Sequence, residues 1–267
     1  MIGDPECLRV LITVMTYPHP KQSHDEVICT AGVTEVGEWV RLFPIDYRYL
    51  PEQQQYHKYQ WIELDVLPRG YKTDVRKESR EPRLKSIRLI GEPLSPANGW
   101  QARRAVIDRL PHHTMKQLTE LYGTEHVSLG VVRPKRVLDL EVTSTDRDWE
   151  PKYQQMFNQK RLFGGPPRTL RKIPFEFRYV FECEDDEKPR RALITDWELG
   201  VLYLKEEARL GSERAASESV KRKFFGEICS EDKDTRFFVG TVFPHKTWIV
   251  VGTFWPPRIE QPQRRLF

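Results

Sequence analysis

Five short apolar segments separated by brief polar turns fill the first 94 residues, and this spacing limits the folds open to the region. The second and third segments join through a short turn at Gly37, which predicts a hairpin. A unit of five short antiparallel strands removes its exposed edges most simply by closing on itself, so we expect a small barrel or a strongly curled sheet. The segments have the length and the β-branched or alternating composition of strands: 8–18, 26–34, 39–45, 59–67 and 85–94.

Helices are inserted before and between further strands in the rest of the chain. Asp196 and Ser212 are suited to cap the two later helices. The whole pattern predicts an α+β fold that is β-rich, with small barrel-like antiparallel units and inserted helices. Helical spacing is found at 103–110, 113–123, 150–163, 192–211 (after an initial strand or turn) and 212–228. Strands are predicted at 126–145 (two, broken at Pro134), 173–185, 235–243 and 247–257.

Two Gly/Pro-rich loops suggest how the chain divides. They separate a barrel-like unit at 1–95, a helical and short-strand connecting region at 96–170, and a C-terminal α+β unit at 171–267. A single continuous domain accounts for the pattern equally well, because 267 residues suffice for one large domain.

The composition indicates where the protein is located in the cell, but it does not indicate a reaction. The net charge is +4, which permits polyanion binding without requiring it. The chain has no apolar run of the roughly 18 residues that a membrane span needs, and its start lacks the basic region of a signal peptide. We therefore expect a cytoplasmic protein with reduced cysteines. None of the four cysteines forms a CxxC pair that would indicate a zinc site.

The segment 69–88 is the most basic part of the N-terminal region. It carries eight basic residues, among them Arg76, Arg80 and Arg83, and three acids. Tyr59 and Trp61 precede it, and basic groups beside exposed aromatics are what single-stranded nucleic acid requires. A solvated loop whose charges pair with one another explains the same composition.

Two further stretches extend this basic character. Arg41 lies inside an apolar strand and is predicted to face outward with Trp39 and Phe43, either as a stacking and phosphate-binding stripe or as an ordinary snorkelling arginine. A second basic segment spans 161–178, and two basic segments on separate loops can flank one groove. It contributes Arg168, Arg171, Lys172 and Arg178.

Asp196 and Glu198 form the strongest candidate for catalysis. On extended backbone, residues two apart share a face, so both carboxylates could bind one divalent ion such as Mg²⁺. Such an ion polarises a phosphodiester and activates water, as a nuclease requires. The competing interpretation is structural, because Asp196 is equally suited to cap a helix.

Several short runs also resemble a known family. TYPHP, CTAG followed by EWVRLFP, KYQWIE, DVRKES, SLGVVRPK and DWE are similar to a widespread, uncharacterised prokaryotic family of small β-rich proteins. The resemblance spans nearly the whole chain. It implies that these runs belong to one architecture, and it implies no activity.

Three hypotheses about function follow. The first is a nucleic-acid-binding protein in which Arg41, Arg76, Arg80, Arg83, Arg168, Arg171, Lys172 and Arg178 contact phosphates and Tyr59 and Trp61 stack on bases. The second is a metal-dependent, nuclease-like enzyme that uses Asp196 and Glu198. The third is a subunit of a larger complex that docks a protein partner through its aromatic C-terminal hairpin and the RRLF tail at 264–267. DNA or RNA is thus the leading partner, and no membrane partner is expected.

Overall fold

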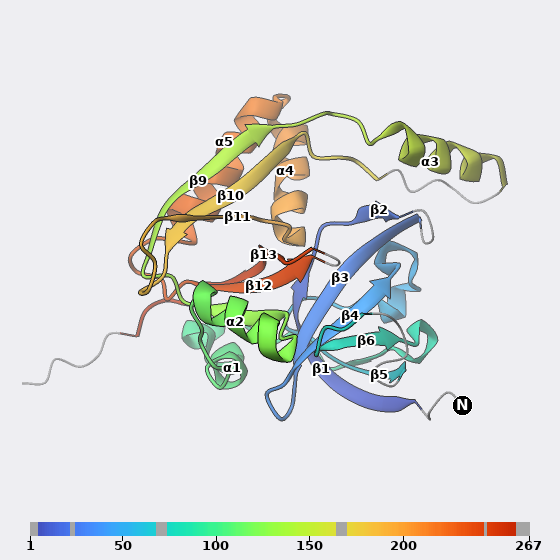
Figure 1. Cartoon of the computed structure of the whole chain (residues 1–267). Helices are drawn as coiled ribbons and strands as arrows, with labels where there is room; N and C mark the ends of the chain where they lie inside the picture. Colours follow the sequence, from blue (N-terminus) through green and yellow to red (C-terminus); the bar gives the residue numbers. More distant parts are fainter. Residues whose placement is uncertain (1–4, 22–24, 68–73, 164–169, 243–244, 260–267) are drawn as a thin grey trace, which may run out of the picture.

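The computed structural model describes residues 5–21, 25–67, 74–163, 170–242 and 245–259 (Figure 1). The strands are β1 (Glu6–Met15), β2 (His19–Lys21), β3 (Asp25–Thr34), β4 (Trp39–Ile45), β5 (Trp61–Leu67), β6 (Ser79–Pro82), β7 (Arg88–Ile90), β8 (Leu129–Val132), β9 (Arg136–Ser144), β10 (Phe175–Glu182), β11 (Arg190–Leu193), β12 (Arg236–Val242) and β13 (Thr247–Phe254). The helices are α1 (Ala97–Ile107), α2 (Met115–Glu125), α3 (Pro151–Phe163), α4 (Trp197–Leu210) and α5 (Glu213–Lys221), which continues into a π-helical turn at Arg222–Glu227. The predicted α+β class is confirmed.

The N-terminal strands close into a barrel. β1 pairs with β3 on one side and with β5 on the other, in both cases antiparallel. β3 also pairs with β4 in antiparallel orientation, and β4 pairs with β6 in parallel. β6 then pairs with β5, which completes the ring β1-β3-β4-β6-β5. This order, with β4 parallel to β6, is that of an OB-fold barrel. Closure leaves none of the five strands as a free edge.

One predicted strand of this barrel is wrong. The segment 85–94 contributes only the short β7, which pairs with β5 outside the ring. The ring is instead closed by β6, which lies within the basic stretch 69–88. β6 is four residues of mostly polar character, so neither its length nor its periodicity distinguishes it from a loop. Apolar side chains of β1, β4 and β5 fill the barrel, including Val10, Ile12, Val40, Leu42, Ile62 and Leu64.

The C-terminal half contains two antiparallel sheets, β11-β10-β9 and β13-β12-β8. An isolated bridge between Ile194 and Val250 links them, and α4 and α5 lie over the β9–β11 sheet in Figure 1. Asp196 and Ser212 cap α4 and α5 as predicted. The break at Pro134 is also confirmed, because β8 ends at Val132 and β9 begins at Arg136.

An apolar cluster separate from the barrel interior, which we call the junction, joins the barrel to the C-terminal half. The barrel contributes side chains from the outer face of β1 and β3, and the sheet β13-β12-β8 packs against them. The junction includes Val14, Ala31, Val33, Leu129, Val131, Phe238, Val251 and Phe254. Each is at most 2% exposed, so this outer face of the barrel is interior to the protein.

Candidate functional site

The barrel strand predicted to contact phosphate faces the junction. Arg41 points away from the barrel interior, as alternation predicts, yet it is only 2% exposed. Its guanidinium donates to the Ser128 carbonyl at 2.9 Å and to the Cys29 sulfur at 3.1 Å. Trp39 on the same face packs edge-on against Phe238 with ring centroids 5.5 Å apart. The expectation of an exposed aromatic–arginine stripe is therefore wrong at Arg41, which the C-terminal half covers, while Trp39 and Phe43 are half-buried.

Tyr59, predicted to stack on bases, is also enclosed. It is 4% exposed, adopts a left-handed φ of 64°, and lies 4.1 Å from the Arg103 guanidinium. Burial raises its pKa, so the phenol stays neutral. Trp61 is half-buried on β5, with the Arg9 guanidinium 5.7 Å from its ring. Of this predicted stacking pair, Trp61 alone is partly exposed.

The basic stretch 69–88 contributes the strand β6 to the barrel wall. Arg76 is 7% exposed, and it donates to Asp74 at 2.6 Å and to the Thr241 carbonyl at 3.1 Å. Arg80 donates to the carbonyls of Lys77 and Ser79. Arg83 is exposed, and its side chain makes no hydrogen bond or ion pair within the described residues. Residues 68–73 lie outside the description.

The two predicted catalytic acids share a lysine. The Lys58 ammonium is 3.1 Å from Asp196 and 2.8 Å from Glu198. The Asp196 side chain is fully buried and also accepts the Glu198 backbone N–H at 2.9 Å, which caps α4. Burial raises the pKa of Asp196 to about 6, although Lys58 opposes the shift. Burial disfavours the charged Lys58, but the two carboxylates outweigh it and raise its pKa, so the lysine remains protonated.

This arrangement differs from a site for a divalent metal. A cation of the chain already lies between the two carboxylates, where Mg²⁺ would have to bind. In the part of the chain that is described, no group of three or more His, Cys, Asp or Glu side chains is placed to hold a metal ion. The three groups therefore form an ionic cluster between the barrel and the C-terminal half. Lys58 comes from the barrel, and the two acids come from the N-terminal end of α4.

The second predicted basic segment surrounds the base of α3. Arg168 lies outside the described residues. Arg171 pairs with Glu207 at 2.7 Å, and its carbonyl accepts the Tyr17 hydroxyl at 2.8 Å. Lys172 donates to the Asp148 carbonyl at 3.2 Å, and Arg178 pairs with Glu176 on β10. These partners lie at the surface, where ion pairs exchange readily with a ligand.

Helix α3 extends this basic segment away from the sheets. Residues 151–172, which we call the basic arm, contain six basic residues and no acid. In Figure 1, α3 lies at the periphery, beyond the end of β9 and β10 and near β2. Lys152 in its first turn is exposed, and Tyr153 meets the His19 ring edge-on at 6.1 Å. The absence of acids within the arm is visible in the sequence. The predicted second basic segment began at residue 161 and therefore left out the first part of the arm.

A cavity of about 230 Å³ lies where the chain enters and leaves α3. Four aromatic rings contribute to its wall: Tyr17, Trp149, Phe175 and Phe177. Lys172 lies at its rim with its ammonium 6.0 Å from the Trp149 ring. Thr195 and Asp196, at the start of α4, complete the lining. Burial raises the pKa of Tyr17 to about 12, so the cavity offers a neutral phenol.

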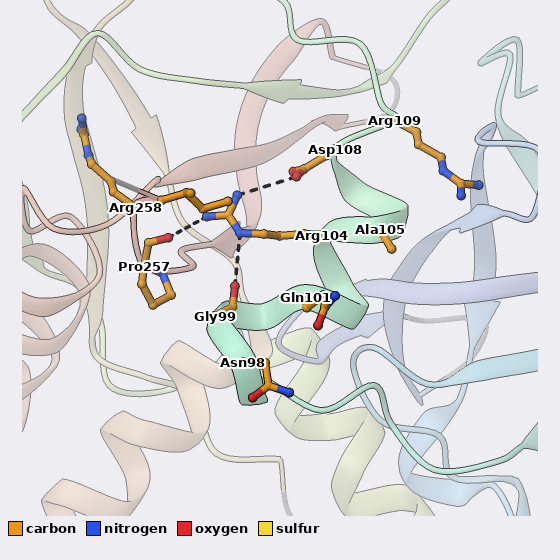
Figure 2. Close-up of a pocket in the computed structure, with 10 residues that line it drawn as sticks. Asn98, Gly99, Gln101, Arg104, Ala105, Asp108, Arg109, Pro257 and Arg258 are labelled. Atoms are coloured by element: carbon orange, nitrogen blue, oxygen red, sulfur yellow. Dashed lines mark hydrogen bonds and ion pairs between the residues drawn. The ribbon is translucent and has the colours of Figure 1, made fainter. Parts of the chain in front are cut away.

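A separate arginine cluster joins α1 to the C-terminal strands. Asp234 lies 3.3 Å from Arg104, 2.9 Å from Arg133 and 2.6 Å from Arg236. Figure 2 shows Arg104 between the carbonyls of Gly99 and Pro257 at a cavity of about 520 Å³. Because Arg104 and Arg236 are buried and both bind Asp234, the cluster acts first as a structural tie. No sequence pattern marks it, since Arg104 and Asp234 are 130 residues apart.

Two family models match the chain, one over the region of the barrel and α1 and one over the C-terminal half. A model described as Domain of unknown function (DUF8757) matches residues 111–267, more than half of the sequence. The chain belongs to this family. A second model, Domain of unknown function (DUF8758), matches residues 6–109. The resemblance to an uncharacterised family is thereby confirmed, while its prokaryotic origin stays a prediction.

Other comparisons add little. No curated protein matches the sequence. A solved structure described as "Structure of murine DNA binding protein bound with ds DNA" has a TM-score of 0.30 and 10% identity, covering 97% of this chain and 98% of that chain. At this TM-score neither its fold nor its ligand can be transferred. Within the described ranges, no helix combines the length and apolar character needed to cross a membrane.

Proposed function

We propose that this protein binds nucleic acid through the basic arm. The observation that carries the proposal is the charge of residues 151–172, which hold six basic residues and no carboxylate. Three of the six lie on α3, which extends to the periphery of the molecule, and the other three follow it in the sequence. Cations placed in this way neutralise phosphates and release counterions, which is the main source of sequence-independent affinity. Arg171 and Lys172 continue the basic surface from α3 toward β10.

Aromatic groups beside the arm support the same function. Trp149 and Tyr153 flank the start of α3, and both pack edge-on against His19. Rings next to a basic track let bases stack while phosphates are held. The two alternatives lack comparable support. Lys58 occupies the space between Asp196 and Glu198. In the hairpin, Phe237, Phe238 and Phe254 are fully buried, so these three rings offer no docking surface. The RRLF tail lies outside the described residues.

The test is a salt titration of binding to labelled single-stranded and duplex oligonucleotides, read by fluorescence anisotropy. The arm variant combines Lys152→Gln, Lys160→Gln and Arg161→Gln. If three phosphate contacts are lost, the magnitude of the log–log salt slope falls by about 2 for single strands and by about 3 for duplex DNA. The matched control, the barrel variant, combines Arg83→Gln, Lys85→Gln and Arg88→Gln, which removes the same charge from the basic stretch 69–88 beside the barrel.

The control separates this proposal from general basicity. A larger effect of the barrel variant would move the binding surface to residues 69–88. Equal effects of both variants would mean that only net charge matters. Absence of binding by the unmodified protein at about 50 mM salt, where phosphate contacts are strong, would exclude nucleic-acid binding.

A further inference from the structure

We propose that the cavity at the base of α3 binds a single unstacked nucleobase. The inference rests on the proposed function, since the basic arm delivers the strand, but it concerns a different group of atoms. The aromatic wall, the polar groups of the lining and the position of the cavity beside the arm carry it.

The size and wall of the cavity suit a planar ring. Engineered cavities of about 150 Å³ accept benzene, and the volume here is about 230 Å³, room for a heterocycle of one or two rings. Phe177 is 1% exposed and forms the inner wall, while Tyr17, Trp149 and Phe175 are half-buried. Enzymes and RNA-binding proteins hold extruded bases between such aromatic side chains.

Polar groups of the lining match the edge of a base. The Thr195 hydroxyl is buried and has no hydrogen-bond partner among the described residues. Such a group carries an unmet desolvation cost that a ligand edge relieves. The His19 Nδ1 lies 3.0 Å from the Pro20 carbonyl, so in the neutral ring Nδ1 donates and Nε2 is left as an acceptor. Lys172 adds a donor at the rim.

The charge of the cavity favours an uncharged ligand. The carboxylate of Asp196 is held by Lys58, and that of Glu176 pairs with Arg178 at 2.5 Å. Neither acid is therefore free to attract an organic cation. The phosphates that flank a base would instead be bound by the arm. Trp149, two residues before the arm, and Lys172, its last residue, both line the cavity. One strand can thus place a base inside and its backbone on the arm.

The experiment compares two duplexes that differ in one group. Both contain a single bulged nucleotide, which is 2-aminopurine in one and an abasic residue in the other. The unmodified protein should bind the base-containing bulge about tenfold more tightly, the scale of one base–aromatic stack. Emission of the 2-aminopurine should fall on binding, because the ring stacks on Trp149.

Variants assign this preference to the cavity. Trp149→Leu and Thr195→Val should each lower the tenfold ratio while the salt slope is unchanged. Thr241→Val is the matched control, because it also removes a buried hydroxyl without a partner, from β12. The arm variant should weaken both duplexes and preserve their ratio.

The outcomes separate the two proposals. Equal binding of the two bulges, with a normal salt slope, overturns the base pocket and leaves the arm as a binding surface. A preference that survives in both Trp149→Leu and Thr195→Val also overturns it, since the base would then bind elsewhere. Failure of both duplexes to bind at low salt overturns the proposed function and the pocket together.

Discussion

At the scale of single residues, Lys58 has the most consequential environment. Its side chain is 7% exposed and it holds the fully buried Asp196, which belongs to the other half of the protein. Removing one partner of a buried ion pair is costly because the remaining charge is left without compensation. The pair therefore makes the relative position of the two halves sensitive to one side chain.

We expect Lys58→Met to lower the free energy of unfolding by about 3–5 kcal/mol. Methionine keeps most of the length of the side chain and removes its charge. Denaturant titration measures the change. The double variant Lys58→Met/Asp196→Asn should recover part of the loss, because asparagine removes the buried charge and still caps α4.

Lys77→Met serves as the control for charge removal. Lys77 pairs with Glu125 at the surface, where both side chains are about half exposed (47% and 52%). Exposed pairs contribute about 1 kcal/mol or less. A Lys58→Met loss no larger than that of Lys77→Met would show that the buried pair does not hold the halves together.

Residue patterns indicated which face Arg41 occupies but not what covers that face. Alternation along β4 is a local property, so it correctly separated Val40 and Leu42 from Trp39 and Arg41. Exposure depends on residues 90 to 200 positions away, such as Ser128 and Phe238, which no spacing rule connects. Lys58 escaped notice for the same reason, since its partners lie about 140 residues further along the chain.

At the scale of elements, strong periodicity was reliable and weak periodicity was not. The strands β4 and β10 and the helix α4 were predicted nearly at their bounds, because apolar residues recur at the period of each element. β6 was missed because closure of the barrel, and not its own composition, makes Ser79–Pro82 a strand. Ring closure is a property of five strands together and leaves no local signal.

One carboxylate links α4 to α5 by a hydrogen bond. Glu206 on α4 accepts from Arg209 at 2.6 Å and from the Ser219 hydroxyl of α5 at 2.8 Å. These hydrogen bonds lower the pKa of Glu206 from 4.5 to about 2. Because the pKa is lower in the folded state, the carboxylate stabilises the protein fully above pH 4.5, and this contribution is lost as the pH falls toward 2.

We therefore expect Glu206→Gln to lower Tm most near pH 6, with the difference from the unmodified protein shrinking between pH 4.5 and 2. Thermal unfolding followed by circular dichroism at several pH values measures this difference. Glu218→Gln is the control, since Glu218 lies on α5 in an exposed pair with Arg214. A Tm difference for Glu206→Gln that is constant with pH would contradict the assigned hydrogen bonds.

At the scale of the whole molecule, the junction makes the barrel and the C-terminal half depend on each other. Divided at Leu110, the barrel would expose Ala31, Val33 and Trp39, and the other half would expose Phe238 and Val251. Contiguous exposed apolar surface of this kind drives association. We expect fragments 1–110 and 111–267 to be poorly soluble alone and to co-purify as a complex when expressed together.

Co-purification through a tag on one fragment, followed by size-exclusion chromatography, tests this expectation. Trp39→Asp in the barrel fragment should abolish the complex, whereas Val36→Asp should not, because Val36 is 81% exposed. Two fragments that are each soluble and monomeric would show that the junction is dispensable for folding.

The junction also constrains how this chain can change over generations. Trp39 and Phe238 meet ring to ring, so a larger side chain on one must be answered by a smaller one on the other. The two regions matched by separate family models should accordingly occur together in related proteins, with paired substitutions at the positions of Trp39 and Phe238. A chain that carries a barrel of this kind alone would need polar residues at the positions of Ala31 and Val33, or a second chain to cover them.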